Sequence, residues 1–568
     1  MSIVQRPDHS VLIPRRAFLK TLAAAGLSSA LVGCAGAGGT VRLRHRFDLI
    51  VRKGTVIDGT GSDGIPADIG IRDGRIDAVG NLESVDAARV IDASGLVVTP
   101  GFIDIHSHTD SQILIRPKAD SKVRQGVTTE VTGADGDSMA PLGGPSLDRQ
   151  LQSFKDEYDF DCPYRDIYGF LTLLEQRGSA QNILTLAGLG TIRECVVGME
   201  NRPATSEEMR RMKEELLRAI EQGCWGASTG LEYTPGSFAT TEELTELMQV
   251  VPEPYRIYAT HMRNEDNTVL EAIAEAITIC RNSGARLQVS HLKASYRVNW
   301  YKQARAIEIL EEAIAQGMEV HADRYPYIAY ATDLTALFPL WSREGGTDQF
   351  LGRLRNPESV ARMREDVLKK VSGLGSWDSV MISRAKKEEH KSYLGRTVGQ
   401  IAGEISTDPF EFTVELLLSE EGKVGMVGFG MDEAGTEMVL KWRNTMVSSD
   451  AGAYAPDSPS RPHPRAYGTF PRAIAHYQRE RKLVTLPEMI RKMTSLPAQK
   501  IGLQDRGMLK VGAWADIVIF DYQNIRDRAT FVDPHQFPDG IPYVLVNGVP
   551  IIDGNTQTSA LPGKVIRS

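Results

Sequence analysis

Short apolar segments alternate with amphipathic helical stretches through residues 101–500, and this alternation is the feature that most constrains the fold. Helical periodicity is clear at residues 206–223 and 267–284, each of which lies between two apolar segments. The apolar segments have the length and composition of buried strands. The eight candidate strands are residues 101–108, 126–133, 182–190, 224–230, 256–263, 286–293, 318–327 and 444–451.

Repeated strand–helix units predict a parallel α/β fold, and eight candidate strands predict a (β/α)8 barrel. A doubly wound sheet is the alternative, but no glycine-rich dinucleotide fingerprint opens the first unit. An insertion at about 331–441 separates the last two candidate strands. Long insertions of this kind often form lids or pocket walls. We therefore expect residues 101–500 to form a barrel with one large insertion.

Strand-rich sequence also stands on both sides of this region. Residues 47–100 and 501–568 contain β-branched runs with Asp-Gly and Lys-Gly turn signals. Neither piece is long enough to bury a good core alone. They could form one small β domain together, or they could be separate modules.

Residues 1–33 have the features of an export signal. Arg15 and Arg16 precede an alanine-rich apolar run that is too short for a stable membrane span, and the arginine pair resembles a twin-arginine signal. The following Leu-Val-Gly-Cys resembles a bacterial lipobox, in which Cys34 is lipidated. We expect residues 34–46 to be a linker, and the protein to be periplasmic with only a lipid anchor in the membrane. A cytoplasmic protein with a basic tail is the alternative.

Composition excludes several classes of protein. The net charge of -8 and the absence of a basic cluster beyond the N-terminus argue against a nucleic-acid partner. The five cysteines form no CxxC pair, so a zinc finger or a disulfide scaffold has little support. Cys162, Cys195, Cys224 and Cys280 are expected to be buried free thiols.

Residue types that can bind metals stand at the ends of several candidate strands. His106 and His108 point to the same side of their strand, so they could share one ion. In a barrel the functional side chains come from the carboxyl ends of different strands. His321, inside the seventh strand, is interpreted as structural. The candidates at strand ends are His106, His108, His261, His291 and Asp450, with Asp135 and Asp137 after the second strand.

Imidazoles and carboxylates without a thiolate cluster suit Zn²⁺ or another divalent transition ion. Such an ion can lower the pKa of bound water to about 7 and polarise a carbonyl group. Asp450 could then act as general base toward the water and return the proton to a leaving amine. The pattern therefore predicts a catalytic metal site.

These residues stand in motifs whose order resembles the amidohydrolase superfamily, and within it the D-aminoacylases (N-acyl-D-amino-acid deacylases). The likeness runs from Phe47 nearly to the C-terminus, and its most specific motif is RPHPRAYGTFPR. The resemblance implies a metal-dependent barrel with a small β-sandwich built from both termini. The other motifs are GFIDIHSHTD, GVTTEVTG, GLEYTPGSFA, YATHMRNE, VSHLK, YPY, SSD, GMLKVGAWADIVIFD and YVLVNG.

The resemblance also implies a role for each residue. His106, His108 and Asp450 correspond to the ligands of one metal subsite, and Asp450 is also the proton carrier. His261 and His291 correspond to the histidines of the other subsite.

Residues outside the metal ligands also have counterparts. Arg465 corresponds to the arginine that holds the substrate carboxylate, for which its fork geometry is suited; a loop salt bridge is the alternative. Lys293 and a tyrosine of YPY, either Tyr325 or Tyr327, correspond to residues of the substrate pocket.

The sequence departs from the family pattern in two places. Asp135 stands where related deacylases usually have a bridging cysteine, and a carboxylate can also bridge two cations. Glu232 is a weaker candidate for that position, and the fourth strand has no lysine that could be carboxylated. Leu292 stands where a second histidine is common, which predicts a more apolar pocket.

The sequence therefore predicts a hydrolase of the linear amide bond of N-acyl amino acids, holding one or two Zn²⁺ ions. The D preference is implied by the resemblance alone. A dipeptidase or a cyclic amide hydrolase of the hydantoinase or dihydroorotase type is one alternative, although Arg465 and the missing lysine count against a cyclic substrate. A non-catalytic, anchored binding lipoprotein is another, but no metal ligand is lost.

Overall fold

The computed structural model describes residues 46–110 and 112–568. The expected signal peptide at residues 1–33, Cys34 and nearly all of the linker at 34–46 lie outside these ranges. Within them, no helix has the length and apolar character needed to cross a membrane.

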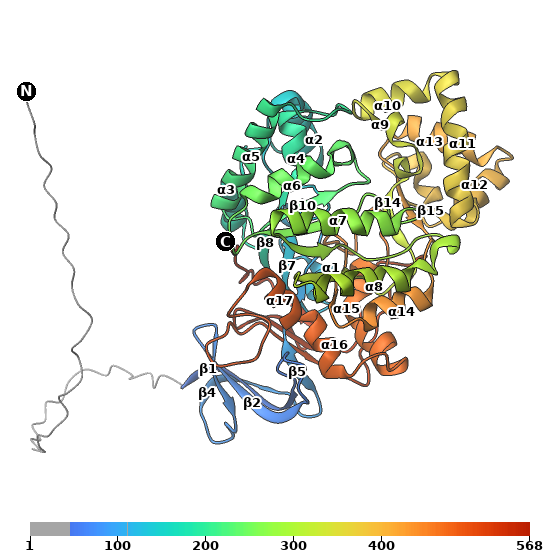
Figure 1. The fold of residues 1–568 in the computed structure, drawn as a ribbon. Coiled ribbons are helices and arrows are strands. Elements are labelled where there is room, and N and C mark those ends of the chain that lie inside the picture. The colour runs from blue at the N-terminus through green and yellow to red at the C-terminus, as the bar shows by residue number, and fades with distance from the viewer. Residues whose placement is uncertain (1–45, 111) are drawn as a thin grey trace, which may run out of the picture. The chain divides into compact units, whose positions relative to one another are not determined.

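The central part of the chain forms a closed barrel of parallel strands, which confirms the expected (β/α)8 architecture (Figure 1). One sheet has the order β17-β13-β12-β11-β10-β9 and another has the order β6-β7-β8. Their strands are β6 (Phe102–Asp104), β7 (Val127–Thr132), β8 (Asn182–Thr185), β9 (Ala187–Gly188), β10 (Ala227–Gly230), β11 (Ile257–His261), β12 (Arg286–Val289), β13 (Val320–Arg324) and β17 (Thr445–Val447).

Two local features turn these sheets into one barrel. β8 and β9 are consecutive halves of the third strand, because β8 pairs with β7 while β9 pairs with β10. A parallel bridge between Ser107 and Ala451 joins the first strand to the last. Every residue of β7, β11 and β13 is buried, as expected for strands that are covered by helices outside and filled by side chains inside.

The helices that cover the barrel form for reasons visible in the sequence. In α5, Thr205 accepts a hydrogen bond from the amide of Glu208, whose side chain accepts one from the amide of Thr205. The helix then buries Met212, Leu216 and Ile220 on one face. The helices of this region are α1 (Asp120–Val123), α2 (Leu147–Tyr158), α3 (Ile167–Arg177), α4 (Leu189–Val196), α5 (Ser206–Glu221), α6 (Thr241–Val250), α7 (Val269–Ser283), α8 (Lys302–Ala315), α14 (Glu433–Lys441), α15 (Arg465–Arg472), α16 (Leu486–Met493) and α17 (Ser495–Ile501).

Strands from both ends of the chain form one nine-stranded sheet. β5 of the N-terminal piece pairs antiparallel with β18 of the C-terminal piece. Ile69 and Val98 from the first piece and Ile517 and Leu545 from the second belong to one buried apolar cluster, so each piece completes the core of the other. The strands are β1 (Phe47–Val56), β2 (Ile65–Arg72), β3 (Arg75–Gly80), β4 (Ala87–Asp92), β5 (Val97–Pro100), β18 (Ile517–Phe520), β19 (Tyr543–Val546), β20 (Val549–Asp553) and β21 (Thr556–Gln557).

The C-terminal region also contacts the barrel directly. The amide of Ile566 donates a hydrogen bond to the carbonyl oxygen of Ile183 at 2.8 Å, and the indole nitrogen of Trp225 donates one to the carbonyl oxygen of Ile566 at 2.8 Å. Earlier in this region, the ring of Phe531 packs edge-on against His463. Only part of residues 501–568 therefore belongs to the sheet.

The segment between β13 and β17 contains a layer with its own apolar core, drawn in yellow and light orange in Figure 1. A three-stranded antiparallel sheet of order β14-β16-β15 lies within it. The sequence predicts an insertion of about 331–441, which includes α14, but α14 contacts α8, β13 and β17 of the barrel, so the inserted layer ends before it. The inserted elements are β14 (Tyr330–Asp333), α9 (Leu340–Arg343), α10 (Thr347–Leu354), α11 (Pro357–Leu374), β15 (Val380–Arg384), α12 (Val398–Glu404), α13 (Pro409–Ser419) and β16 (Gly425–Gly428).

Cysteines within the described ranges form no disulfide. Cys195, Cys224 and Cys280 are buried, as the sequence predicted, whereas Cys162 is only half-buried.

Lys492 of α16 provides a test of the packing beside β17. Its ammonium donates to the carbonyl oxygens of Trp442 at 2.5 Å and Thr445 at 3.2 Å, and burial lowers its pKa to about 7. The unfolded chain therefore binds one more proton than the folded chain between this value and about 10.5, so stability rises with pH in that window.

We predict that Lys492→Met reduces the rise of the free energy of unfolding with pH by up to about 1.4 kcal/mol per pH unit. Urea unfolding at pH 7.5 and 9 measures the change, with the exposed Lys441→Met as the matched control. Equal pH dependence in the wild type and Lys492→Met would contradict the assigned protonation.

Candidate metal centre

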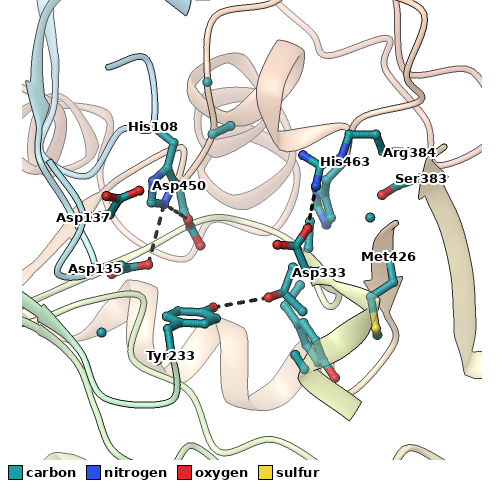
Figure 2. A pocket seen from close by; sticks show the side chains of 18 of the residues that line it. His108, Asp135, Asp137, Tyr233, Asp333, Ser383, Arg384, Met426, Asp450 and His463 are labelled. Carbon is teal, nitrogen blue, oxygen red and sulfur yellow. Dashed lines mark hydrogen bonds and ion pairs between the residues drawn. The ribbon is translucent and has the colours of Figure 1, made fainter. Parts of the chain in front are cut away.

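The carboxyl ends of the barrel strands bring the predicted ligands together. His261 ends β11, and the others lie in the loops directly after β6, β7, β12 and β17. A cavity of about 1130 Å³ opens over them (Figure 2). All of them line this cavity except His106, which lies beneath it. The ligand candidates are His106, His108, Asp135, His261, His291 and Asp450.

Two donor groups are present, and Asp135 belongs to both. The first donor group is His106, His108, Asp135 and Asp450, and the second is Asp135, His261 and His291; within each, the ligand atoms lie within 4.8 Å of one another. Oδ1 of Asp135 is 3.4 Å from Nε2 of His106, while its Oδ2 is 3.5 Å from Nε2 of His291. One carboxylate thus faces both groups.

These residues fit a divalent transition cation. Nε2 of His106 and Oδ1 of Asp135 are buried 3.4 Å apart, and neither has a hydrogen-bond partner among the described residues. Buried polar atoms are normally paired, so unpaired atoms that converge call for a ligand. Nitrogen and oxygen donors without thiolates are those that Zn²⁺ accepts.

The charge of the centre favours a cation as well. Burial by itself lowers the pKa of an imidazole, but the carboxylates of Asp135 and Asp450 raise the pKa of His108 to about 9. Burial is likewise outweighed at His261, where Glu265 and Asp135 raise the pKa to about 10. In the metal-free protein, protons thus balance the negative charge that a bound cation would balance instead.

The loop after β7 holds Asp135 in an unusual backbone conformation. Asp135 has φ of 52°, in the left-handed region, and His291 and Asp450 also have positive φ. Gly136 follows Asp135, and a Cβ there would lie 2.6 Å from the amide nitrogen of Gly230. Only glycine allows this close approach, which brings the loop against β10 and points the Asp135 carboxylate at the histidines.

Asp323, at the end of β13, is a residue of the centre that we did not predict. It is fully buried and lies 3.3 Å from Nδ1 of His106, which donates to it, and it accepts from the amide of His291 at 3.0 Å. Such a carboxylate fixes the tautomer of a ligating histidine. The strand-end rule did not find Asp323, because the seventh candidate strand extends to residue 327, whereas β13 ends at Arg324.

Glu265 was also missed, although it stands in the YATHMRNE motif. Its carboxylate is 3.0 Å from Nδ1 of His291 and accepts from the ammonium of Lys293 at 2.6 Å. Lys293 lines the cavity and is buried beside the Glu265 carboxylate and the His291 imidazole. Glu232, the weaker ligand candidate, is 3.8 Å from Nε2 of His261 and belongs to neither donor group.

The residues predicted to bind substrate occupy different positions. Arg465, at the start of α15, donates to Oδ2 of Asp450 at 2.7 Å, and its guanidinium lies over the ring of Tyr325. Tyr325 lines the cavity, whereas Tyr327 packs against His463 and does not line it. His463, within the PHPR motif, accepts from the amide of Arg465 and so holds this arginine in place.

A closed (β/α)8 barrel with histidines and carboxylates converging at the carboxyl ends of its strands defines a metal-dependent hydrolase of the amidohydrolase type. A profile of the amidohydrolase family matches residues 89–146 and 435–552. Over 522 residues the chain is 33% identical to a D-aminoacylase from Alcaligenes xylosoxydans xylosoxydans, a match that covers 92% of this chain and 97% of the relative. An N-acyl-D-glutamate deacylase from the same organism is 32% identical over 526 residues, covering 92% and 97%.

The structural comparison agrees. The crystal structure of N-acyl-D-glutamate deacylase from Bordetella bronchiseptica, complexed with zinc and a phosphonate inhibitor, superposes with a TM-score of 0.79 at 32% identity, and the match covers 92% of this chain and all of that chain. The chain belongs to the D-aminoacylase family of amidohydrolases.

The shared position of Asp135 predicts the effect of removing it. Asp135→Ala should lower the bound zinc per protein below that of the wild type, because both donor groups lose a ligand. Glu232→Gln, the matched control, should retain the wild-type amount. Metal analysis after dialysis, with circular dichroism to verify folding, measures both. Unchanged zinc in Asp135→Ala would show that another residue or water fills its place.

Asp323 is expected to act through His106. Asp323→Asn should weaken zinc binding by about 10- to 100-fold, because the imidazole loses the partner that fixes its orientation. Competition with a chromophoric chelator gives the affinity, and the exposed Asp63→Asn serves as control. An affinity equal to that of the wild type would contradict the orienting role.

Proposed function

We propose that this protein is a metal-dependent N-acyl-D-amino-acid deacylase, which hydrolyses the linear amide bond to release a carboxylate and the free amino acid. The observation that carries the proposal is the pair of donor groups joined by Asp135, beside Arg465 in one cavity. The family relationship supports this function, and the names of the relatives support the D preference.

The first and second donor groups would each hold one ion, with Asp135 between them. When bound, a divalent cation such as Zn²⁺ supplies Lewis-acid chemistry to the amide carbonyl and makes water more acidic. The retained ligand set argues against a non-catalytic binding lipoprotein. β10 contributes no side chain to either donor group, which disfavours an arrangement built on a carboxylated lysine.

Asp450 is the proton carrier in this proposal. Its Oδ1 lies 3.0 Å from Nε2 of His108, while its Oδ2 accepts from Arg465. Burial alone would raise the pKa of this carboxyl, but Arg465 and the histidines hold it well below the usual range. Asp450 is therefore ionised at neutral pH. It takes a proton from the attacking water and delivers it to the amide nitrogen as the carbon–nitrogen bond breaks.

Arg465 binds the α-carboxylate of the substrate. Arg465 lines the cavity, and Asp450 accepts from only one of its guanidinium nitrogens, Nη1. The ring of Tyr325 beneath the guanidinium limits its orientation. Because Arg465 contacts Asp450, a carboxylate held there places the adjacent amide next to the proton carrier.

We also propose that the protein is exported by the twin-arginine route and anchored through Cys34. The order of arginine pair, apolar run and cysteine in residues 1–34 supports this proposal.

Hydrolysis of paired N-acetyl-D- and N-acetyl-L-amino acids tests the proposed activity. We expect release of free amino acid from the D series, and its loss after treatment with a chelator. Asp450→Asn should lower kcat by at least about 10²-fold, because the side-chain amide of asparagine cannot accept the proton of the attacking water. Asp457→Asn, an exposed change in the loop after the same strand, should leave kcat unchanged. Equal hydrolysis of both series, or an active Asp450→Asn, would contradict the proposal.

A further inference from the structure

The cavity over the metal centre is larger than an N-acetyl amino acid requires. Its volume of about 1130 Å³ exceeds the range of about 300–1,000 Å³ that holds drug-sized ligands. The barrel loops form one side of it and the inserted layer forms the other. Figure 2 shows the two sides, with Ser383, Arg384 and Met426 facing His108 and Asp450 across the cavity.

The two sides differ in charge. Charged residues that line the cavity from the barrel loops are mostly acidic, as a metal centre requires. Charged residues that line it from the inserted layer are five cations and one acid, Asp333. We call these cations the basic wall: Lys370, Arg384, Lys386, Lys391 and Lys423.

Most of the charge on the basic wall is not neutralised by its neighbours. Arg384 pairs with Asp333 at 2.6 Å, but this pair is exposed and worth little. Lys391 donates to a backbone carbonyl oxygen, which leaves its charge uncompensated. Lys370 also donates to a carbonyl oxygen, but its charge and His261 outweigh burial and lower the pKa of Glu232, so it is partly compensated. The ammonium groups of Lys386 and Lys423 have no hydrogen-bond or ion-pair partner within the described ranges.

The wall is built on an ordered sheet. On the central strand β16, Gly425 pairs with Asp333 of β14 on one side and with Arg384 of β15 on the other. A Cβ at Gly425 would lie 2.8 Å from Oγ of Ser383 and 3.0 Å from Cβ of Arg384, so glycine allows this close packing. The Glu420 carboxylate accepts from the amide of Lys386 at 2.6 Å and fixes the start of the next loop.

We propose that the basic wall binds a second anionic group of the substrate, a carboxylate separate from the α-carboxylate held by Arg465. This inference rests on the proposed function and narrows its substrate class to diacids. The second carboxylate can belong to the amino-acid side chain or to the far end of the acyl group. Lys386 and Lys423 are exposed, so the attraction that they exert on a carboxylate in the cavity is screened by water and salt.

Two matched pairs of substrates distinguish these sources. N-acetyl-D-glutamate against N-acetyl-D-glutamine changes only the charge of the side chain. N-succinyl-D-leucine against its terminal amide changes only the charge of the acyl end. For at least one pair we expect wild-type kcat/KM to favour the acid by about twofold to fivefold. This preference should fall when the salt concentration is raised, because charged contacts of this kind are screened.

In the double variant Lys386→Met/Lys423→Met, the ratio of kcat/KM for the acid to kcat/KM for the amide should fall close to one. The variant should still hydrolyse N-acetyl-D-leucine as the wild type does. Lys387→Met is the matched control, because Lys387 is exposed, donates to Oγ of Ser419 and does not line the cavity. It should retain the full preference. A change in fold would alter the hydrolysis of N-acetyl-D-leucine as well. The ratio of kcat/KM for the acid to kcat/KM for the amide therefore isolates the effect of charge.

The outcomes are separable. A preference that the double variant loses in one pair supports the proposal and identifies which end of the substrate carries the anion. Hydrolysis of N-acetyl-D-leucine without an acid preference in either pair overturns the basic wall as a subsite and leaves the deacylase function intact. A preference that survives in the double variant also overturns it. If the wild-type protein hydrolyses none of these substrates, the proposed function itself is overturned.

Discussion

The metal centre depends on the closure of the barrel between its first and last strands. The amide of His108 donates to the carbonyl oxygen of Ala451 at 3.1 Å, and the amide of Asp450 donates to that of His106 at 3.0 Å. These two backbone bonds join residues more than three hundred positions apart in the sequence and set the spacing of the first donor group. Any strand slip at this seam would move both histidines relative to Asp450, because side chains alternate along a strand.

Around this seam, buried charges are arranged so that each has a partner. Asp323 accepts from His106, and Glu265 lies between His291 and Lys293. Unpaired buried charges would destabilise the fold by several kcal/mol, so the same contacts that orient the ligands also make their burial possible. Stability and metal binding therefore use one network, within which Nε2 of His106 and Oδ1 of Asp135 are left without a hydrogen-bond partner.

Much of this arrangement could be predicted from the sequence. The barrel follows from eight buried segments separated by helices, and His106, His261 and Asp450 follow from their places at strand ends. Asp323 and Glu265 were not predicted, because Asp323 stands inside the seventh candidate strand and Glu265 two residues beyond the fifth, and only the fold brings these two beside His106 and His291. Likewise, α14 has an ordinary amphipathic sequence, and only its packing on α8 and β17 separates it from the insertion.

The pairing of β5 with β18 has a consequence for how the chain acquires its fold during synthesis. These strands are about four hundred residues apart, so at roughly 5–20 residues per second the N-terminal strands are made about 20 to 80 seconds before their partners exist. The last residues, which bond to Ile183 and Trp225, are made later still. The sheet that the first strands begin is thus completed only after the barrel strands have been synthesised, and an N-terminal fragment lacks both that sheet and the final contacts of the barrel.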